Sequence, residues 1–365
     1  MDRRTYDWLA LNFVDGLGKV GYCNLIRKFR SPERVFNASI KDLEGVEGLR
    51  RKVIRGIKEF DQTARVENEL KLMHAHGVSL VTLLDDNYPS NLLNIYDPPP
   101  FLYVKGELKK EDKIAVAVVG SRFASHYGKL TTERISQDIA SKGVTIVSGM
   151  ARGIDTSAHR GALSVKGRTI AVLGCGVDVN YPVENRKVRE EIASSGALIS
   201  EFHMSAPPAS SHFPMRNRII SGLSLGVVVI EASHRSGSLI TARLALEQGR
   251  DVFAVPGSID SLRSRGTHKL IKEGAKLVED AEDIITELLP QIKGFAHSAD
   301  RAHDSEERLS REAKAIFKLL ESGQLQIDAI ISGTGLSSSQ VSSTLLDLEL
   351  SGLIGQLPGK VFVRN

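Results

Sequence analysis

The segment KIAVAVVG at residues 113–120 decides the fold class, because it is a β-branched apolar run that ends in glycine and precedes Ser121 and Arg122. Five similar segments follow it: VTIVSG (144–149), RTIAVLG (168–174), ALISEF (197–202), LGVVVIEA (225–232) and DVFAVPG (251–257). Their centres are 25 to 29 residues apart, which leaves room for one helix between successive strands. Near-continuous apolar character is typical of parallel strands covered on both faces. The sequence therefore predicts an α/β fold with an extended Rossmann-like parallel sheet.

Other structural patterns flank this region on both sides. Residues 79–106 contain SLVTLL, three consecutive prolines and FLYVKG, which predicts one or two additional strands. The first 60 residues contain two similar pieces, each with a helical pattern, a glycine turn and a basic helix. This repeat predicts tandem helix-hairpin-helix motifs in a SAM-like helical domain.

The C-terminal part begins with a stretch that has no hydrophobic periodicity and is predicted to be a linker. Three helical patterns and a terminal hairpin follow, and this order is typical of a winged-helix domain. We therefore expect four regions: a helical domain (1–70), a Rossmann-like domain (71–290), a linker (291–306) and a winged-helix domain (307–365).

Composition excludes several classes of protein. The apolar runs are far shorter than the ~20 residues that span a bilayer, and the first residues lack the pattern of a secretory signal. Cys23 and Cys175 lack the spacing of a metal site or a disulfide framework. We expect a cytoplasmic protein without a membrane segment. Residues 1–60 carry 13 basic and 8 acidic residues, a net charge of +5, so a polyanionic partner could contact this end.

The segments that follow the strands are polar and rich in glycine, for example Gly120-Ser121-Arg122 and the run SGMARG at 148–153. In a parallel sheet such segments lie at the ligand-binding edge, where backbone N–H groups and helix N-termini favour phosphate. Glycine is also common in these turns for steric reasons alone. A Walker Lys-Ser/Thr pair and a G-x-G-x-x-G fingerprint are absent from these loops. ATP hydrolysis and NAD binding are therefore disfavoured, and no cofactor is predicted.

A second polar cluster, HFPMRNRII at 212–220, is predicted to open a helix at the same edge. Its two arginines and amide would form a clamp for a phosphate backbone, although solvated surface charge is the alternative. Five aromatic residues also follow the strands and could stack on the bases of single-stranded nucleic acid or pack in the core. They are Phe123, Tyr127, Tyr181, Phe202 and Phe213.

Three further features have structural explanations of equal or greater weight. The hydroxyl-rich run from Ser236 to Thr241 could bind phosphate or cap a helix. Asp155 and His159 lie four residues apart, but a helix-capping aspartate and a packing histidine are favoured over a catalytic pair. Cys175 lies between two glycines and is expected to be a small packed residue rather than a nucleophile.

The two flanking domains differ in the charge of their helices. The basic helices of the N-terminal repeat could contact phosphate without reading sequence, or could serve only to dock a protein. The expected recognition helix, around 337–350, contains Asp347 and Glu349 but no lysine or arginine. This composition disfavours a sequence-specific transcription regulator and favours protein contact or a minor nucleic-acid role.

Six ordered motifs together resemble the DprA/Smf family. They are GSRFASHYG (120–128), SGMARGIDTSAHRGAL (148–163), GCGVDVNYPVEN (174–185), HFPMRNRIISGLS (212–224), EASHRSGSLITARLALEQGRDVFAVPGS (231–258) and GTHKLIKEGAKLV (266–278). The resemblance covers residues 80–290, and the flanking domains are similar to those of the longer family members. It implies a protein that binds single-stranded DNA, protects it from nucleases and helps to load RecA during natural transformation.

The resemblance also implies roles for individual residues. Those expected to bind DNA are Gly120, Ser121, Arg122, Gly149, Arg152, Phe213, Arg216, Asn217, Arg218, Gly237 and Ser238. Family members dimerise through the Rossmann-like domain, and our hypothesis for this surface comprises His268, Leu270 and Leu277. No catalytic residue, metal ligand or RecA-contacting residue is predicted.

The alternative function is a nucleotide-binding hydrolase of the phosphoribohydrolase type, which has a related fold. Its signature is a Pro-Gly-Gly-x-Gly-Thr loop followed by a catalytic acid. Here the corresponding loop is Arg235-Ser236-Gly237-Ser238-Leu239-Ile240-Thr241, and Ala242 takes the place of the acid. This departure argues against hydrolysis.

Overall fold

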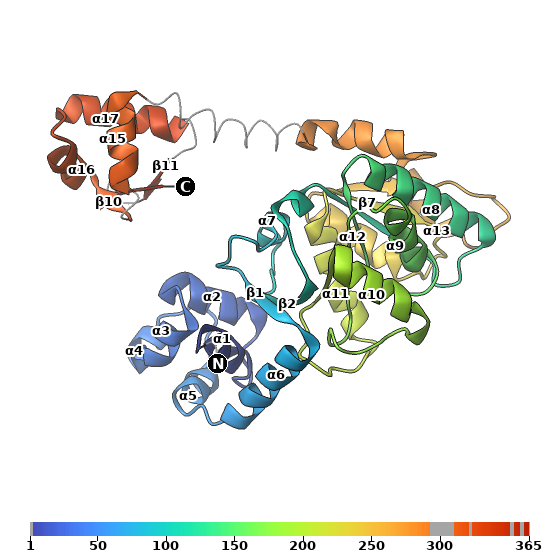
Figure 1. The fold of residues 1–365 in the computed structure, drawn as a ribbon, viewed down its shortest axis with the longest axis horizontal. Coiled ribbons are helices and arrows are strands. Elements are labelled where there is room, and N and C mark those ends of the chain that lie inside the picture. Colours follow the sequence, from blue (N-terminus) through green and yellow to red (C-terminus); the bar gives the residue numbers. More distant parts are fainter. Residues whose placement is uncertain (1–2, 293–309, 321–322, 351–353, 358–360, 365) are drawn as a thin grey trace. The chain divides into compact units, whose positions relative to one another are not determined.

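A computed structural model describes residues 3–292, 310–320, 323–350, 354–357 and 361–364. The chain divides into two compact units, Met1–Leu288 and Leu289–Asn365 (Figure 1). The first contains a group of N-terminal helices and a large sheet, and the second a small three-stranded sheet with helices. The predicted fold class is confirmed.

Six short helices form the N-terminal part of the first unit: α1 (Arg3–Asn12), α2 (Lys19–Phe29), α3 (Pro32–Asn37), α4 (Ile40–Glu44), α5 (Arg51–Lys58) and α6 (Thr63–His76). Trp8 of α1 stacks on Tyr22 of α2 with ring centroids 5.7 Å apart, and both rings meet Phe101 edge-on. Phe101 begins a strand of the large sheet, so the helices and the sheet share one hydrophobic core.

The large sheet has nine strands in the order β1-β2-β6-β5-β4-β3-β7-β8-β9. From β6 to β9 all neighbours are parallel, while β2 runs antiparallel to both β1 and β6. The strands are β1 (Ser79–Thr82), β2 (Phe101–Gly106), β3 (Ala115–Gly120), β4 (Thr145–Ser148), β5 (Thr169–Val172), β6 (Ala197–Ser200), β7 (Gly226–Ile230), β8 (Asp251–Ala254) and β9 (Lys276–Leu277).

Helices cover both faces of this sheet, which explains why its central strands are buried throughout. α8, α9 and α10 pack together on one face, and α11 and α12 pack together on the other. The helical segments are α7 (Ser90–Leu93), η1 (Lys110–Lys113), α8 (His126–Ser141), α9 (Ile154–Ser164), η2 (Val183–Asn185), α10 (Arg186–Ser195), α11 (His212–Leu223), α12 (Ser238–Glu247), α13 (Arg265–Lys272) and a helix at 281–292.

The six predicted strands correspond to β3 through β8, and the two additional ones to β1 and β2. Two details differ from the sequence-based expectation. The short strand β9 was not predicted, because two residues are too few to show a pattern. Gly153 rather than Asp155 holds the N-cap position of α9, since Asp155 already lies in the first helical turn.

The order of the strands creates a topological switch point beside β3. This strand pairs with β4 on one side and β7 on the other, and the connecting helices leave in opposite directions. At the carboxyl end of the pair, Gly120 lies opposite Ile230. A Cβ atom at Gly120 would lie 1.8 Å from the Ile230 carbonyl oxygen, so this end requires glycine. A switch point is where ligands bind in open α/β sheets.

The second unit contains α15 (Arg311–Leu319), β10 (Leu325–Gln326), α16 (Ile327–Thr334), α17 (Ser338–Leu350), β11 (Ile354–Leu357) and β12 (Val361–Arg364). Its sheet has the order β10-β12-β11, and Ile316, Leu345 and Phe362 pack in its core. α17 coincides with the predicted recognition helix. The predicted boundary at residue 70 lies inside the first compact unit and stays a prediction. Residues 293–306 of the predicted linker lie outside the described residues.

Candidate nucleic-acid interface

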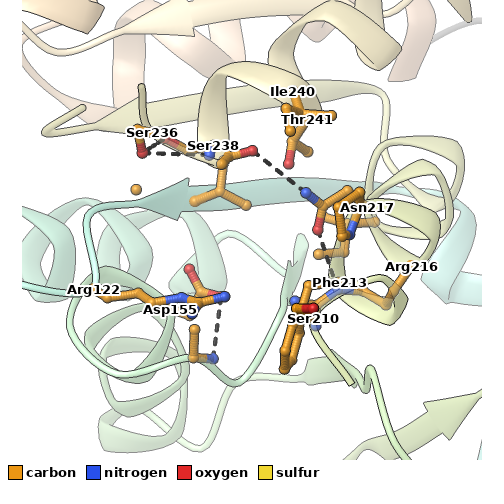
Figure 2. A pocket seen from close by; sticks show the side chains of 16 residues that line it. Arg122, Asp155, Ser210, Phe213, Arg216, Asn217, Ser236, Ser238, Ile240 and Thr241 are labelled. Carbon is orange, nitrogen blue, oxygen red and sulfur yellow. Dashed lines mark hydrogen bonds between the residues drawn. The ribbon is translucent and has the colours of Figure 1, made fainter. Parts of the chain in front are cut away.

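The N-termini of α9, α11 and α12 converge on a pocket of about 430 Å³ at the switch point (Figure 2). Several of its lining residues were predicted to bind DNA: Gly120, Arg122, Phe213, Arg216, Asn217, Gly237 and Ser238. A helix N-terminus carries a partial positive charge and unpaired N–H groups, so three of them directed at one space favour an anion.

Arg216 is almost fully buried beneath this pocket. Its Nη1 donates to the Gly149 carbonyl oxygen at 2.5 Å and also to the Val172 carbonyl, while Nε donates to Asn217 Oδ1 at 3.2 Å. A Cβ atom at Gly149 would lie 2.6 Å from the guanidinium, so glycine is required there by the arginine. Burial lowers the pKa of Arg216 to about 10. Arg216 therefore joins the ends of β4 and β5 and places a cation under the site.

Asp155 supplies the carboxylate beside Arg216. Its Oδ2 accepts from the Ala151 N–H at 3.2 Å, which holds the turn that precedes α9. Burial raises the pKa of Asp155, and the charge of Arg216 opposes this effect. His159 lies one turn further on and is fully buried, with Nδ1 at 2.7 Å from Thr169 Oγ1. Its pKa is lowered to about 3 by burial, so the structure supports a packing role for this histidine.

The turn before α12 forms the opposite wall. Asn217 Nδ2 donates to the Gly237 carbonyl oxygen at 3.4 Å and connects α11 with α12 (Figure 2). The Ser236 and Ser238 hydroxyls are 2.8 Å apart. An ideal Cβ at Gly237 would meet no atom within 4 Å, in contrast to Gly120 and Gly149. Steric crowding within the chain therefore does not explain this glycine, and the space in front of it is open to a ligand.

Arg122 and Phe213 connect this pocket with a second hollow of about 190 Å³, which both residues also line. The guanidinium carbon of Arg122 lies 5.0 Å from the centre of the Phe213 ring, and Tyr181 lies 5.9 Å from the same ring. Arg122 is exposed, and no carboxylate lies within 4.0 Å of its nitrogens among the described residues. A guanidinium and aromatic rings therefore lie side by side where the two cavities meet. The guanidinium can bind a phosphate of a nucleic acid, and the rings can stack on its bases.

Arg218 departs from the prediction. It lies two residues after Arg216, but it does not line the pocket. Its Nε donates to Asp97 at 2.8 Å and its Nη2 to Glu201 at 2.7 Å, and its side chain is only 7% exposed. Lys19 pairs with the same Glu201. The ion pairs of Arg218 connect α11 to the loop before β2 and to the end of β6, and its contact with DNA stays a prediction.

Three other predicted DNA-binding residues lie at the margins. Gly149 and Arg152 line the smaller hollow, and Arg152 is exposed and paired with Glu184 at 2.5 Å. The Ser121 hydroxyl accepts from the Phe123 N–H at 3.1 Å and shapes the loop after β3.

The residues of the predicted dimer surface have different environments. Leu277 is 44% exposed, and His268 is half-buried with Nε2 at 3.0 Å from the Gly257 carbonyl oxygen. Leu270 is buried in the core of its own chain, and its place in a dimer surface stays a prediction.

Some pocket residues were not predicted from the sequence, notably Ser210, Ile220 and Ile240. The hydroxyl-rich loop before α11 was a signal for Ser210, whereas the two isoleucines resemble any core residue. Cys175 lines the smaller hollow, and burial raises its pKa, which agrees with the expected packed thiol. Within the described ranges there is no cluster of histidine, cysteine and carboxylate side chains suited to a metal, and no helix there could cross a membrane.

Comparison with known proteins identifies the family. Residues 79–289, more than half of the chain, match the family model described as DNA recombination-mediator protein A. The chain belongs to the DNA recombination-mediator protein A family. Residues 300–360 match the model described as the DprA winged helix domain. The resemblance inferred from the six motifs and the expected winged-helix domain are thereby confirmed.

Relatives of this DprA family cover most of the chain. Protein Smf of Synechocystis is 34% identical over 98% of this chain and 98% of its own length, and Protein Smf of Escherichia coli is 40% identical over 80% and 79%. Among solved structures, DNA processing protein A of Streptococcus pneumoniae matches with a TM-score of 0.68 and 40% identity, covering 79% of this chain and 99% of that one. DNA processing protein A of Helicobacter pylori, described for its single-stranded DNA binding mode, matches with a TM-score of 0.53 and 33% identity, covering 59% and 96%.

Proposed function

We propose that this protein binds single-stranded DNA in the pocket at the switch point. The observation that carries the proposal is the exposed, unpaired Arg122 above the Phe213 ring, beside three converging helix N-termini. Phosphates meet cations and N–H groups there, and unstacked bases meet aromatic faces. The related protein of Helicobacter pylori, whose solved structure concerns single-stranded DNA binding, supports the same assignment.

In this proposal the protein is a recombination mediator that protects incoming single strands and loads RecA onto them during natural transformation. Family membership supports this role. Binding without catalysis is part of the proposal, because the carboxylate in the pocket, Asp155, holds the turn before α9. The position where a phosphoribohydrolase would carry its acid is occupied by the buried Ala242.

The experiment that tests this function is a fluorescence anisotropy titration of a labelled single-stranded oligonucleotide, with unlabelled single- and double-stranded competitors of equal length. We expect single strands to compete much better, because a duplex hides the faces of its bases. Absence of binding at moderate salt, or equal competition by duplex, would contradict the proposal. A nucleotide-turnover screen on the same preparation would then test the hydrolase alternative.

We also propose a homodimer that uses the exposed Leu277 on β9, at the edge of the sheet. Leu277→Asp should shift the protein to the mass of one chain in light scattering, because a charge is costly to bury in an apolar interface. Leu246→Asp is the matched control, since Leu246 is 60% exposed on α12 and lies outside the hypothesised dimer surface. An unchanged mass for Leu277→Asp would exclude this surface.

A further inference from the structure

A third cavity of about 520 Å³, which we call the rim hollow, lies on the other side of the loop that carries Arg122. Its walls come from the start of α8 (Ser125 and Tyr127), the end of β7, and the segment between β8 and α13. The loop 121–125 is therefore shared: one side borders the proposed DNA pocket and the other borders this hollow.

Large apolar side chains are exposed on the segments that form this hollow: Tyr127 lines it, and Phe123, Ile259 and Leu262 lie within two residues of residues that do. Phe123 is 80% exposed, Tyr127 55%, Ile259 82% and Leu262 64%. We call these four residues the rim patch. Arg263 connects its two halves, because its Nε donates to the Phe123 carbonyl oxygen at 2.8 Å. Exposed apolar groups gathered in this way mark an interaction surface more often than single exposed residues do.

Positive charge predominates around the rim patch, where three arginines outnumber one exposed carboxylate, Asp260, which lies next to Ile259. Arg122, Arg263 and Arg265 are exposed, and within the described part of the chain no carboxylate forms an ion pair with any of them. Glu231, the carboxylate in the hollow, is already occupied: its two oxygens accept from the Ser125 N–H and hydroxyl. The surface therefore attracts an anion that also carries flat apolar groups.

The start of α8 is held firmly enough to present an aromatic ring. Ser125 caps the helix, since its Oγ accepts from the Gly128 N–H at 3.0 Å. A Cβ atom at Gly128 would lie 2.6 Å from the Glu231 carboxylate, so that contact is close-packed. Because the backbone that carries Tyr127 is already ordered, a base that stacks on the ring has less chain to immobilise.

We infer that single-stranded DNA continues from the Arg122 pocket across loop 121–125 onto the rim patch, where its bases stack on Phe123 and Tyr127. This inference rests on the proposed function and extends its binding site. Single strands are favoured over duplex because only unpaired bases expose faces to Tyr127. Phe123 and Arg122 both line the smaller hollow of about 190 Å³, so the path runs from the pocket through Phe123 to Tyr127.

The test compares thymidine oligonucleotides of about 6 and about 20 nucleotides, one near the lower end and one above the upper end of the usual site size of about 4 to 16 nucleotides per OB fold. The variants are Tyr127→Ala and Tyr127→Phe, with Tyr96→Ala as the matched control, since Tyr96 is 92% exposed and lines none of these hollows. Arg122→Ala reports on the original pocket. Circular dichroism checks that each variant is folded.

We expect Tyr127→Ala to bind the short oligonucleotide like the wild type but the long one about tenfold more weakly. Tyr127→Phe and Tyr96→Ala should match the wild type at both lengths, because stacking uses the ring and not the hydroxyl. A photoreactive base placed beyond the first nucleotides should crosslink to the peptide that contains Tyr127.

Three results would overturn the inference. Tyr127→Ala could bind both lengths like the wild type, or it could lose affinity equally at both. Light scattering could instead show that Tyr127→Ala changes the oligomeric state, which would assign the rim patch to a contact between copies of the chain. Failure of the wild type to bind either oligonucleotide would refute the proposed function itself, and this result is distinct from the other three.

Discussion

At the scale of single residues, three arginines near one pocket have three different roles. Arg122 is exposed over an aromatic ring, and Arg216 donates to buried carbonyl groups. Arg218 forms ion pairs with two carboxylates. Only Arg122 combines a free guanidinium with access to the pocket. A basic residue in a motif is therefore a ligand contact only where its hydrogen bonds are not already used inside the protein.

Arg122→Ala should weaken binding of single-stranded DNA by about 1 to 3 kcal/mol, because one charge-assisted contact is lost. Its free energy of unfolding should be nearly unchanged. The control is Arg243→Ala, which removes an exposed arginine paired with Glu247 on α12. Anisotropy titrations check affinity and urea denaturation checks stability. If the two variants bound DNA with equal affinity, Arg122 would not contact the DNA.

His159 should make the stability depend on pH. The imidazole has a pKa of 6.5 in the unfolded chain and about 3 in the folded protein. Between these values the unfolded chain binds a proton that the folded protein does not bind. As far as His159 is concerned, the free energy of unfolding has its full value above pH 6.5. It decreases as the pH falls toward 3, with a slope approaching about 1.4 kcal/mol per pH unit. His159→Gln should lack this slope when urea denaturation is compared at pH 7 and pH 5. If the wild type and His159→Gln lost the same free energy of unfolding between pH 7 and pH 5, His159 would not be neutral and buried in the folded protein.

At the scale of elements, the beginnings of helices determine the site. α9, α11 and α12 each start at the pocket, while α8 starts between the pocket and the rim hollow. Glu231, which adopts a left-handed φ of 52°, accepts from Ser125 and fixes α8 to the end of β7. The position of Tyr127 therefore depends on a contact between residues that are 106 apart in the chain.

Ser125→Ala should lower the free energy of unfolding by about 1 to 2 kcal/mol, because the first turn of α8 loses its cap and Glu231 loses a donor. Ser141→Ala, at the opposite end of the same helix, is the control. Ser141 is exposed and its hydroxyl donates only to the Gln137 carbonyl, so little change is expected. Urea denaturation of both variants measures the difference, and equal stabilities would contradict the capping role.

At the scale of the whole molecule, the N-terminal helices are part of the main core. The stacked Trp8 and Tyr22 rest on Phe101 of β2, and Lys19 of α2 pairs with the buried Glu201 at the end of β6. Removing residues 1–60 would expose these groups and would confound any binding measurement. Surface charge is the better probe of this domain.

The triple substitution of Arg50, Arg51 and Lys52 by glutamine should reduce the dependence of DNA affinity on salt. The three residues are exposed at the start of α5, while Val53, Ile54 and Ile57 keep the helix in the core. Each phosphate contact removed should lower the slope of log affinity against log salt by about 0.7 for a single strand. Titrations between low and moderate salt measure this slope. An identical slope would show that this domain does not contact phosphate.

Local patterns determined much of this protein. The six apolar segments, their spacing and the glycine-rich turns predicted β3 through β8 and the edge where the site lies, because period and chain length are local properties. The ordered motifs also identified the family. The clustering of Gly120, Arg122, Phe213 and Arg216 followed from the rule that the carboxyl ends of parallel strands share one edge.

Only the tertiary structure decided which of these residues are free to bind. Arg216 and Arg218 are neighbours in one motif, yet their different partners, Gly149 and Glu201, come from distant segments. The burial of Leu270, the exposure of Tyr127 and the open space before Gly237 likewise depend on side chains brought together by folding. Whether a polar side chain can bind a ligand depends on the packing of the whole protein. A buried polar group forms its hydrogen bonds within the protein, and only the donors and acceptors that remain can contact a ligand.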